Sequence, residues 1–130
     1  MALHWSRRVL QGRPRPASYL RLARLYQRAG ESRQALEAAA AGLARHPRAL
    51  GLIVFKARIL IDQGALASAR VTLSGAPGPS ELGLREQVEL LGQQVALERA
   101  SDHPRRAARL DARLRLLRQM LSGRRRPVKR

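Results

Sequence analysis

The sequence contains no cysteine and very few aromatic residues. Without cysteine, the chain can form neither a disulfide framework nor a cysteine-ligated metal site. Aromatic residues make up only 3% of the 130 residues, although 45% are hydrophobic, so a core has to be built from leucine, alanine and valine. These side chains suit closely packed helices better than a β-sandwich. We therefore expect an all-α fold.

Lysine and acidic residues are also scarce, so arginine dominates the charge. The chain has 26 basic residues against nine acidic ones, for a net charge of +17. Residues 1–50 carry a net +8, residues 51–100 are neutral, and residues 101–130 carry +9. Such a field attracts acidic protein, nucleic acid or anionic lipid without choosing among them. The excess of arginine can also result from a GC-rich genome, in which arginine codons are common. The positive charge therefore has two open explanations, binding of an anionic partner and codon composition.

The sequence lacks a long hydrophobic run. No segment approaches the roughly 20 apolar residues that a membrane-spanning helix needs. Residues 1–16 are basic and lack the apolar core of a secretory signal. We therefore expect a cytoplasmic protein with a basic N-terminal segment. Its Trp5 is expected to pack against the first helices, with docking on a partner as the alternative.

Helical spacing of apolar residues begins at Ala17 and predicts two helix pairs. The expected helices are 17–29 with 32–46, and 49–63 with 66–75. Gly30 and Gly64 end the first helix of each pair, since glycine favours the C-terminal cap. Ser32 is the expected N-cap of its helix. Pro47 ends the helix before it because the residue preceding a proline disfavours the α conformation.

A third, less regular pair is expected at 86–100 and 104–121. It follows the breaker cluster GAPGPS at residues 75–80, which predicts a turn. Ser101 or Asp102 is the expected cap of the last helix, with Pro104 in its first turn. One face of this helix repeats leucine, which predicts a capping helix, although a leucine stripe among arginines also suits an anionic membrane surface. The polar tail, 122–130, is expected to be disordered.

The first two pairs are related by an offset of 34 residues. The matched positions are Ala23 with Ala57, Tyr26 with Leu60, Gly30 with Gly64, Ala35 with Ala69, and Ala39 with Leu73. The small residues among them are expected where two helices come closest. A regular period of this length is typical of stacked helical repeats.

These residues resemble the tetratricopeptide repeat over 17–121. The first copy carries the pattern at Tyr19, Leu22, Ala23, Tyr26, Gly30, Ala35 and Pro47. The sequence departs from the family pattern where Ala23 replaces a glycine, Lys56 replaces a leucine and Leu60 replaces an aromatic residue. The resemblance implies a short right-handed α-solenoid of about three antiparallel helix pairs with a basic C-terminal capping helix.

The resemblance also implies a binding mode, in which the first helix of each pair lines a concave groove that takes a partner's peptide. Arg24 and Arg28 are four residues apart, so they present neighbouring guanidinium groups to a carboxylate ligand. Phe55 departs from the polar lining that a chaperone-tail clamp needs, so we expect a different acidic or partly apolar segment. The partner-binding candidates are Leu20, Arg21, Arg24, Arg28, Val54 and Arg58.

No catalytic constellation is evident in the sequence. The three histidines, His4, His46 and His103, have no second ligand at metal-binding spacing on one helix face. The GAPGPS cluster lacks the glycine pattern of a phosphate-binding loop. We therefore expect no enzymatic activity, no cofactor and no metal.

Two functions from different classes follow. The first is a non-enzymatic adaptor that binds a protein partner, such as a chaperone-like subunit of a larger bacterial assembly. Because two clear repeats are fewer than a stable array usually has, association with a partner or a second copy is also expected. The alternative is nonspecific binding of RNA or an anionic membrane through the basic termini. Scarce aromatic side chains argue against sequence-specific RNA recognition.

Overall fold

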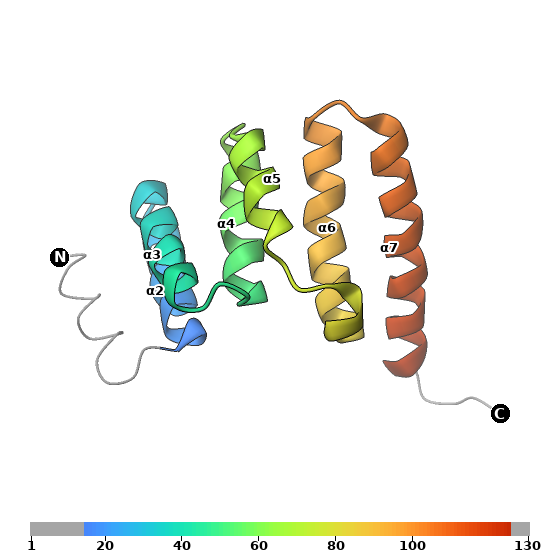
Figure 1. The fold of residues 1–130 in the computed structure, drawn as a ribbon, viewed down its shortest axis with the longest axis horizontal. Coiled ribbons are helices and arrows are strands. Elements are labelled where there is room, and N and C mark those ends of the chain that lie inside the picture. The colour runs from blue at the N-terminus through green and yellow to red at the C-terminus, as the bar shows by residue number, and fades with distance from the viewer. Residues whose placement is uncertain (1–14, 126–130) are drawn as a thin grey trace. The chain divides into compact units, whose positions relative to one another are not determined.

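The computed structural model describes residues 15–125, and every regular element in that part of the chain is helical. The expectation of an all-α fold is therefore confirmed. The expected packing of Trp5 lies outside the described residues. The helices are α2 (Pro16–Arg28), α3 (Ser32–Arg45), α4 (Leu50–Asp62), α5 (Leu66–Ser74), α6 (Leu84–Ala100) and α7 (Pro104–Arg125), with a short 3-10 helix η1 (Pro79–Glu81) before α6 (Figure 1).

The first four helices match the sequence prediction to within one residue at each end. Pro16 occupies the first position of α2, where its fixed φ suits the helix and its missing N–H is not needed. The expected cap of α3 was wrong. Glu31 is the N-cap and makes no side-chain capping hydrogen bond, and Ser32 is the first helical residue.

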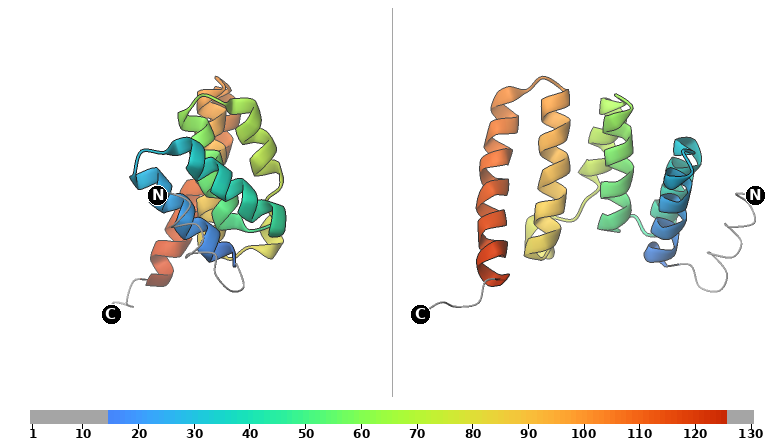
Figure 2. Two further views of the ribbon diagram at one scale, coloured as in Figure 1. Left: turned by 90° about the vertical axis from the view of Figure 1, so that its left-hand side faces the viewer. Right: turned by 180° about the vertical axis from the view of Figure 1, so that it is seen from behind.

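The helices are grouped in two compact units, one ending at Ala76 and the other beginning at Pro77. In the first unit, α2 packs against α3 and α4, α3 also packs against α4, and α4 packs against α5. In the second unit, α6 and α7 lie side by side (Figure 2). The boundary falls within the GAPGPS cluster, where a breaker was expected.

Small side chains allow the helices of the first unit to pack closely. The four alanines matched by the 34-residue offset, Ala23, Ala35, Ala57 and Ala69, have no exposed surface. Two of them, Ala23 and Ala35, belong to a core shared by α2, α3 and α4. The larger buried members of that core are Tyr19, Leu22, Leu52, Phe55 and Ile59.

A glycine that the sequence pattern did not single out marks a tighter approach. A Cβ added to Gly42 of α3 would lie 2.7 Å from Leu52 Cδ1 and 2.7 Å from Tyr19 Cβ. These distances are far shorter than any ordinary carbon contact, so α3 can reach both neighbours only with hydrogen at this position.

The three helix pairs are closed by turns of the same kind. Gly30 and Gly64 have φ of 78°, and Asp102 has φ of 58° at the corresponding place before α7. Aspartate tolerates this left-handed conformation better than most residues. Asp102 therefore occupies the place of the turn glycine. Because α7 begins at Pro104, His103 lies at the N-cap position, and the expectation of Ser101 or Asp102 there was wrong. The backbone N–H that follows each of the three positive-φ residues donates to a carbonyl five residues earlier: Glu31 to Tyr26 (2.9 Å), Ala65 to Leu60 (2.8 Å) and His103 to Glu98 (2.9 Å).

The first helices of the three pairs start at regular intervals. They begin at Pro16, Leu50 and Leu84, which are 34 residues apart. The third of these helices, α6, starts two residues earlier than expected because the Glu86 carboxylate accepts a hydrogen bond from the Gly83 N–H at 2.9 Å. It has 17 residues, whereas α2 and α4 have 13, so its turn is displaced by four residues.

The leucine stripe of α7 packs against α6. Leu114 and Leu117 are buried in one cluster with Leu91 and Val95 of α6. The helix continues to Arg125, four residues beyond the expected end at Leu121. Residues 122–125 are thus helical and not part of a disordered tail, since no proline occurs between Pro104 and Pro127 to stop the helix. The rest of the expected tail, 126–130, lies outside the described residues.

Candidate functional site

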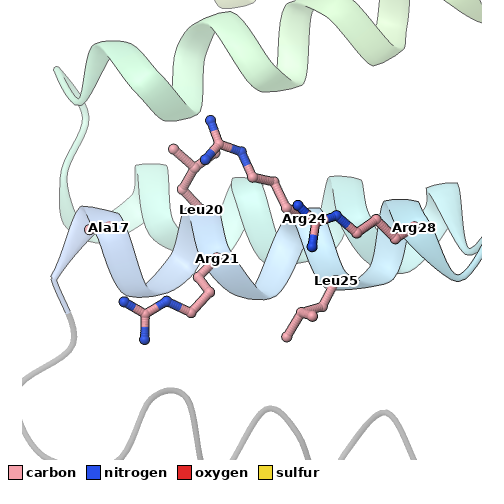
Figure 3. A pocket seen from close by; sticks show the side chains of 6 residues that line it. All are labelled: Ala17, Leu20, Arg21, Arg24, Leu25 and Arg28. Atoms are coloured by element: carbon pink, nitrogen blue, oxygen red, sulfur yellow. The ribbon is translucent and has the colours of Figure 1, made fainter.

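A hollow of about 300 Å³ lies along one side of α2. This side is opposite to the buried one, which carries Tyr19, Leu22 and Ala23. Because residues three and four apart share a helix face, the spacing of the sequence alone places the lining residues together. The lining residues are Ala17, Leu20, Arg21, Arg24, Leu25 and Arg28 (Figure 3).

The lining side chains divide into two directions. Leu20 and Arg24 point toward α4, whereas Arg21 and Leu25 point the other way (Figure 3). The approach to α4 is close at Leu20, because a Cβ added to Gly51 would lie 3.2 Å from Leu20 Cδ2. Leu20 is therefore held by packing, and Arg24 extends from the next turn of the same helix face.

The arginines of this hollow are not neutralised by nearby acids. Arg21, Arg24 and Arg28 are exposed, and none of them forms an ion pair within the described part of the chain. The sequence of α2 contains no acidic residue. The hollow consequently presents positive charge beside the apolar side chains of Leu20 and Leu25, which suits a ligand with both carboxylate and apolar groups.

Four of the six candidates from the sequence, all on α2, line this hollow. The other two, Val54 and Arg58 of α4, are not among its lining residues. They follow Gly51 by three and seven residues, so they continue the α4 face that begins beside Leu20. Leu25 also lines the hollow but was not among the candidates from the sequence. Its signal was the four-residue spacing from Arg21.

A second hollow, of about 430 Å³, lies at the turn between α6 and α7. Beside it, the His103 Nδ1 atom lies 2.9 Å from Oε1 of Glu98, a residue that is only 7% exposed. The sequence pattern did not reveal this pair, because a separation of five residues across a turn matches no helix-face spacing. The lining residues are Asp102, His103, Pro104, Arg105, Arg106 and Arg109.

The described residues contain no group of three or more histidine and acidic side chains placed to hold a metal ion. Over the same residues, no buried side-chain nitrogen or oxygen lacks a hydrogen-bond partner. None of the helices in residues 15–125 combines the length and apolar composition that crossing a membrane requires.

Comparisons with known protein families, with curated proteins and with solved structures found no match. The function is therefore inferred from the surfaces of the molecule itself.

Proposed function

We propose that this protein is a non-enzymatic interaction module that binds an acidic, partly apolar segment of a partner protein on α2. The observation that carries this function is the lining of the α2 hollow, where two leucines lie among three arginines that form no ion pair within the described residues. The leucines supply apolar area to bury, and the arginines orient the segment through its carboxylates.

The two kinds of side chain contribute differently to binding. Exposed ion pairs are worth only about 0 to 1 kcal/mol each, so the arginines mainly accelerate and orient the encounter. Burial of apolar side chains against Leu20 and Leu25 provides more of the affinity. A segment that alternates acidic and apolar residues over two helical turns fits this arrangement better than a purely acidic one.

We further propose that the three helix pairs are antiparallel hairpins of a right-handed, tetratricopeptide-like solenoid. The 34-residue spacing of the starts of α2, α4 and α6 supports this architecture, as do the three turns with the same hydrogen bonds. In such an array the first helices line one concave wall. Val54 and Arg58 of α4 would then extend the binding surface that begins on α2.

Photo-crosslinking in cells tests which class of molecule occupies the hollow. A benzophenone amino acid replaces Ala17, which lines the hollow, and in a control protein it replaces Ala40, an exposed alanine on α3. We expect protein adducts at position 17 that are missing at position 40, with the crosslinked segment identified by mass spectrometry. Adducts with nucleic acid alone, or equal adducts at both positions, would contradict the proposed function.

A synthetic peptide of the crosslinked segment then tests the arginines. The Arg24→Glu, Arg28→Glu double variant should weaken binding at least about tenfold, which corresponds to about 1.4 kcal/mol. The matched control is Arg105→Glu, Arg109→Glu on α7, which changes the net charge equally and should alter the affinity by less than about twofold. Equal losses in the two variants would mean that only net charge matters.

A further inference from the structure

The outer face of α7 carries a compact row of arginines. Arg105, Arg106, Arg109 and Arg113 are all exposed. At a rise of 1.5 Å per residue they extend over about 12 Å of the helix axis, and positions four and seven residues apart share a side. The row therefore occupies one face of the first three turns of α7.

This row, Arg105–Arg113, keeps its charge uncompensated. None of its four arginines forms an ion pair with any residue that the structure describes. The only acidic residue of α7 is Asp111, whose side chain is 16% exposed and lies 2.9 Å from Arg115 and 3.7 Å from Arg99. Asp111 thus pairs with arginines outside the row and does not neutralise the row's charge.

The start of α7 adds to this positive field. Arg105, Arg106 and Arg109 line the hollow of about 430 Å³ at the α6–α7 turn, together with His103. Asp102 also lines it, so three arginines face one carboxylate. The first N–H groups of a 22-residue helix point toward the same end, where the helix dipole favours an anion.

The chemistry of this face favours neither a lipid bilayer nor a second copy of the chain as the main occupant. The leucines beside the row pack against α6, with Leu114 only 3% exposed, and the exposed Leu116 lies beyond Arg113. A second copy would bring like charges together. Between Arg105 and Arg113 the other exposed residues are Ala108 and Ala112, so the row lacks the apolar core of a protein interface. Binding to the phosphate backbone of a nucleic acid requires positive charge but no apolar contact area.

We propose that the Arg105–Arg113 row of α7 binds the phosphate backbone of nucleic acid without reading its sequence. Each planar guanidinium can donate two hydrogen bonds to one phosphate, which a lysine cannot do. The row offers no aromatic side chain for base stacking, so affinity depends on charge and falls steeply with salt. This surface is separate from the α2 hollow.

Fluorescence anisotropy with the full chain tests the row. The ligands are a fluorescein-labelled single-stranded RNA of mixed sequence and a DNA duplex of the same sequence, each titrated across a salt series. The variant is Arg105→Gln, Arg109→Gln, Arg113→Gln. Its matched control is Arg21→Gln, Arg24→Gln, Arg28→Gln on α2, which removes the same charge from another exposed helix face. Residues 126–130 are present in all proteins, so their contribution is constant.

We expect the α7 variant to bind both nucleic acids at least about tenfold more weakly than the wild type at low salt. The slope of its plot of log Kd against log salt concentration should be smaller by about 2 to 3. Each lost phosphate contact lowers this slope by about 0.7 to 0.9. The α2 control should lose less than about threefold. Far-UV circular dichroism should be the same for all proteins because the substituted side chains are exposed and glutamine is a good helix former.

Three results would overturn the proposal. The first is equal weakening in the α7 variant and the α2 control, which would reduce the effect to net charge. The second is an unchanged salt dependence in the α7 variant. The third is a loss of binding by the α7 variant to phosphatidylserine-containing vesicles but not to RNA or DNA, which would assign the row to membranes.

Discussion

His103 and Glu98 hold the α6–α7 turn together through both their backbones and their side chains. The His103 N–H donates to the Glu98 carbonyl at 2.9 Å, and His103 Nδ1 lies 2.9 Å from Glu98 Oε1. The backbone bond is also present in the other two turns, whereas the side-chain contact is a feature of this one. It provides a hydrogen-bond partner for a buried carboxylate.

Removing the imidazole should destabilise the second unit. For His103→Ala we expect the free energy of unfolding to fall by about 1 to 2 kcal/mol, because a buried carboxylate loses a hydrogen-bond partner. Glu98→Gln retains an oxygen that can accept from Nδ1, so its effect should be smaller. Urea unfolding followed by circular dichroism measures both variants, and a larger loss for Glu98→Gln would contradict the assignment.

The positive φ angles of the turns give opposite expectations for two substitutions. Gly30→Ala places a side chain at φ of 78° and should destabilise the protein by about 1 kcal/mol, although nothing lies within 4 Å of the new Cβ. Asp102→Gly relieves the same conformation and should stabilise the protein by about 0.5 kcal/mol. Thermal melting of the two variants checks the signs, and a stabilising Gly30→Ala would exclude the observed turn geometry.

Two mid-helix glycines should respond in opposite directions to alanine. Gly42→Ala creates a contact of 2.7 Å with both Leu52 and Tyr19, so we expect a loss of about 1 to 3 kcal/mol. Gly92→Ala in α6 meets nothing within 4 Å and should gain about 0.5 to 1 kcal/mol from helix propensity. Equal unfolding midpoints for the two variants would show that α3 does not approach its neighbours as described.

The same close packing applies to Ala35, which has no exposed surface. We expect Ala35→Leu to overpack the core of α2, α3 and α4 and to cost about 1 to 3 kcal/mol. Chemical denaturation measures the loss. An unchanged midpoint would mean that the small side chain is not required there.

The leucines of α7 divide into buried and exposed sets that mutation can separate. Leu114 is 3% exposed and packs with the α6 cluster, so Leu114→Ala should cost about 2 to 4 kcal/mol. Leu116 is 57% exposed, and Leu116→Ala should change stability by less than about 0.5 kcal/mol. Similar losses for both variants in urea unfolding would contradict the packing of this stripe against α6.

The sequence by itself determined the class of fold and nearly all the helix boundaries. Glycine and proline stop helices through their own backbone geometry. The periodicity of apolar residues can be recognised from positions only three or four residues apart. These effects act along the chain, so Gly30, Gly64 and Pro47 had predictable places. The burial of Ala23 and Ala57 was also foreseeable, because the 34-residue offset relates equivalent positions.

The grouping of four α2 candidates in one hollow also followed from helix periodicity. The same periodicity puts Arg21 on a different side from Leu20 and Arg24, which are four residues apart, and Arg21 points away from them (Figure 3). Periodicity within one helix did not show that Val54 and Arg58 of α4 are not among the residues that line the hollow. That outcome depends on how α2 and α4 pack.

Only the tertiary structure decided the contacts between elements. Gly42 is required because two other helices approach it, and Glu98 pairs with His103 because a turn brings them together. The longer α6 moved the third turn by four residues, so Asp102 took the role that glycine has in the other turns. Local propensity extends over only about one helical turn, whereas packing joins residues that are far apart in the chain.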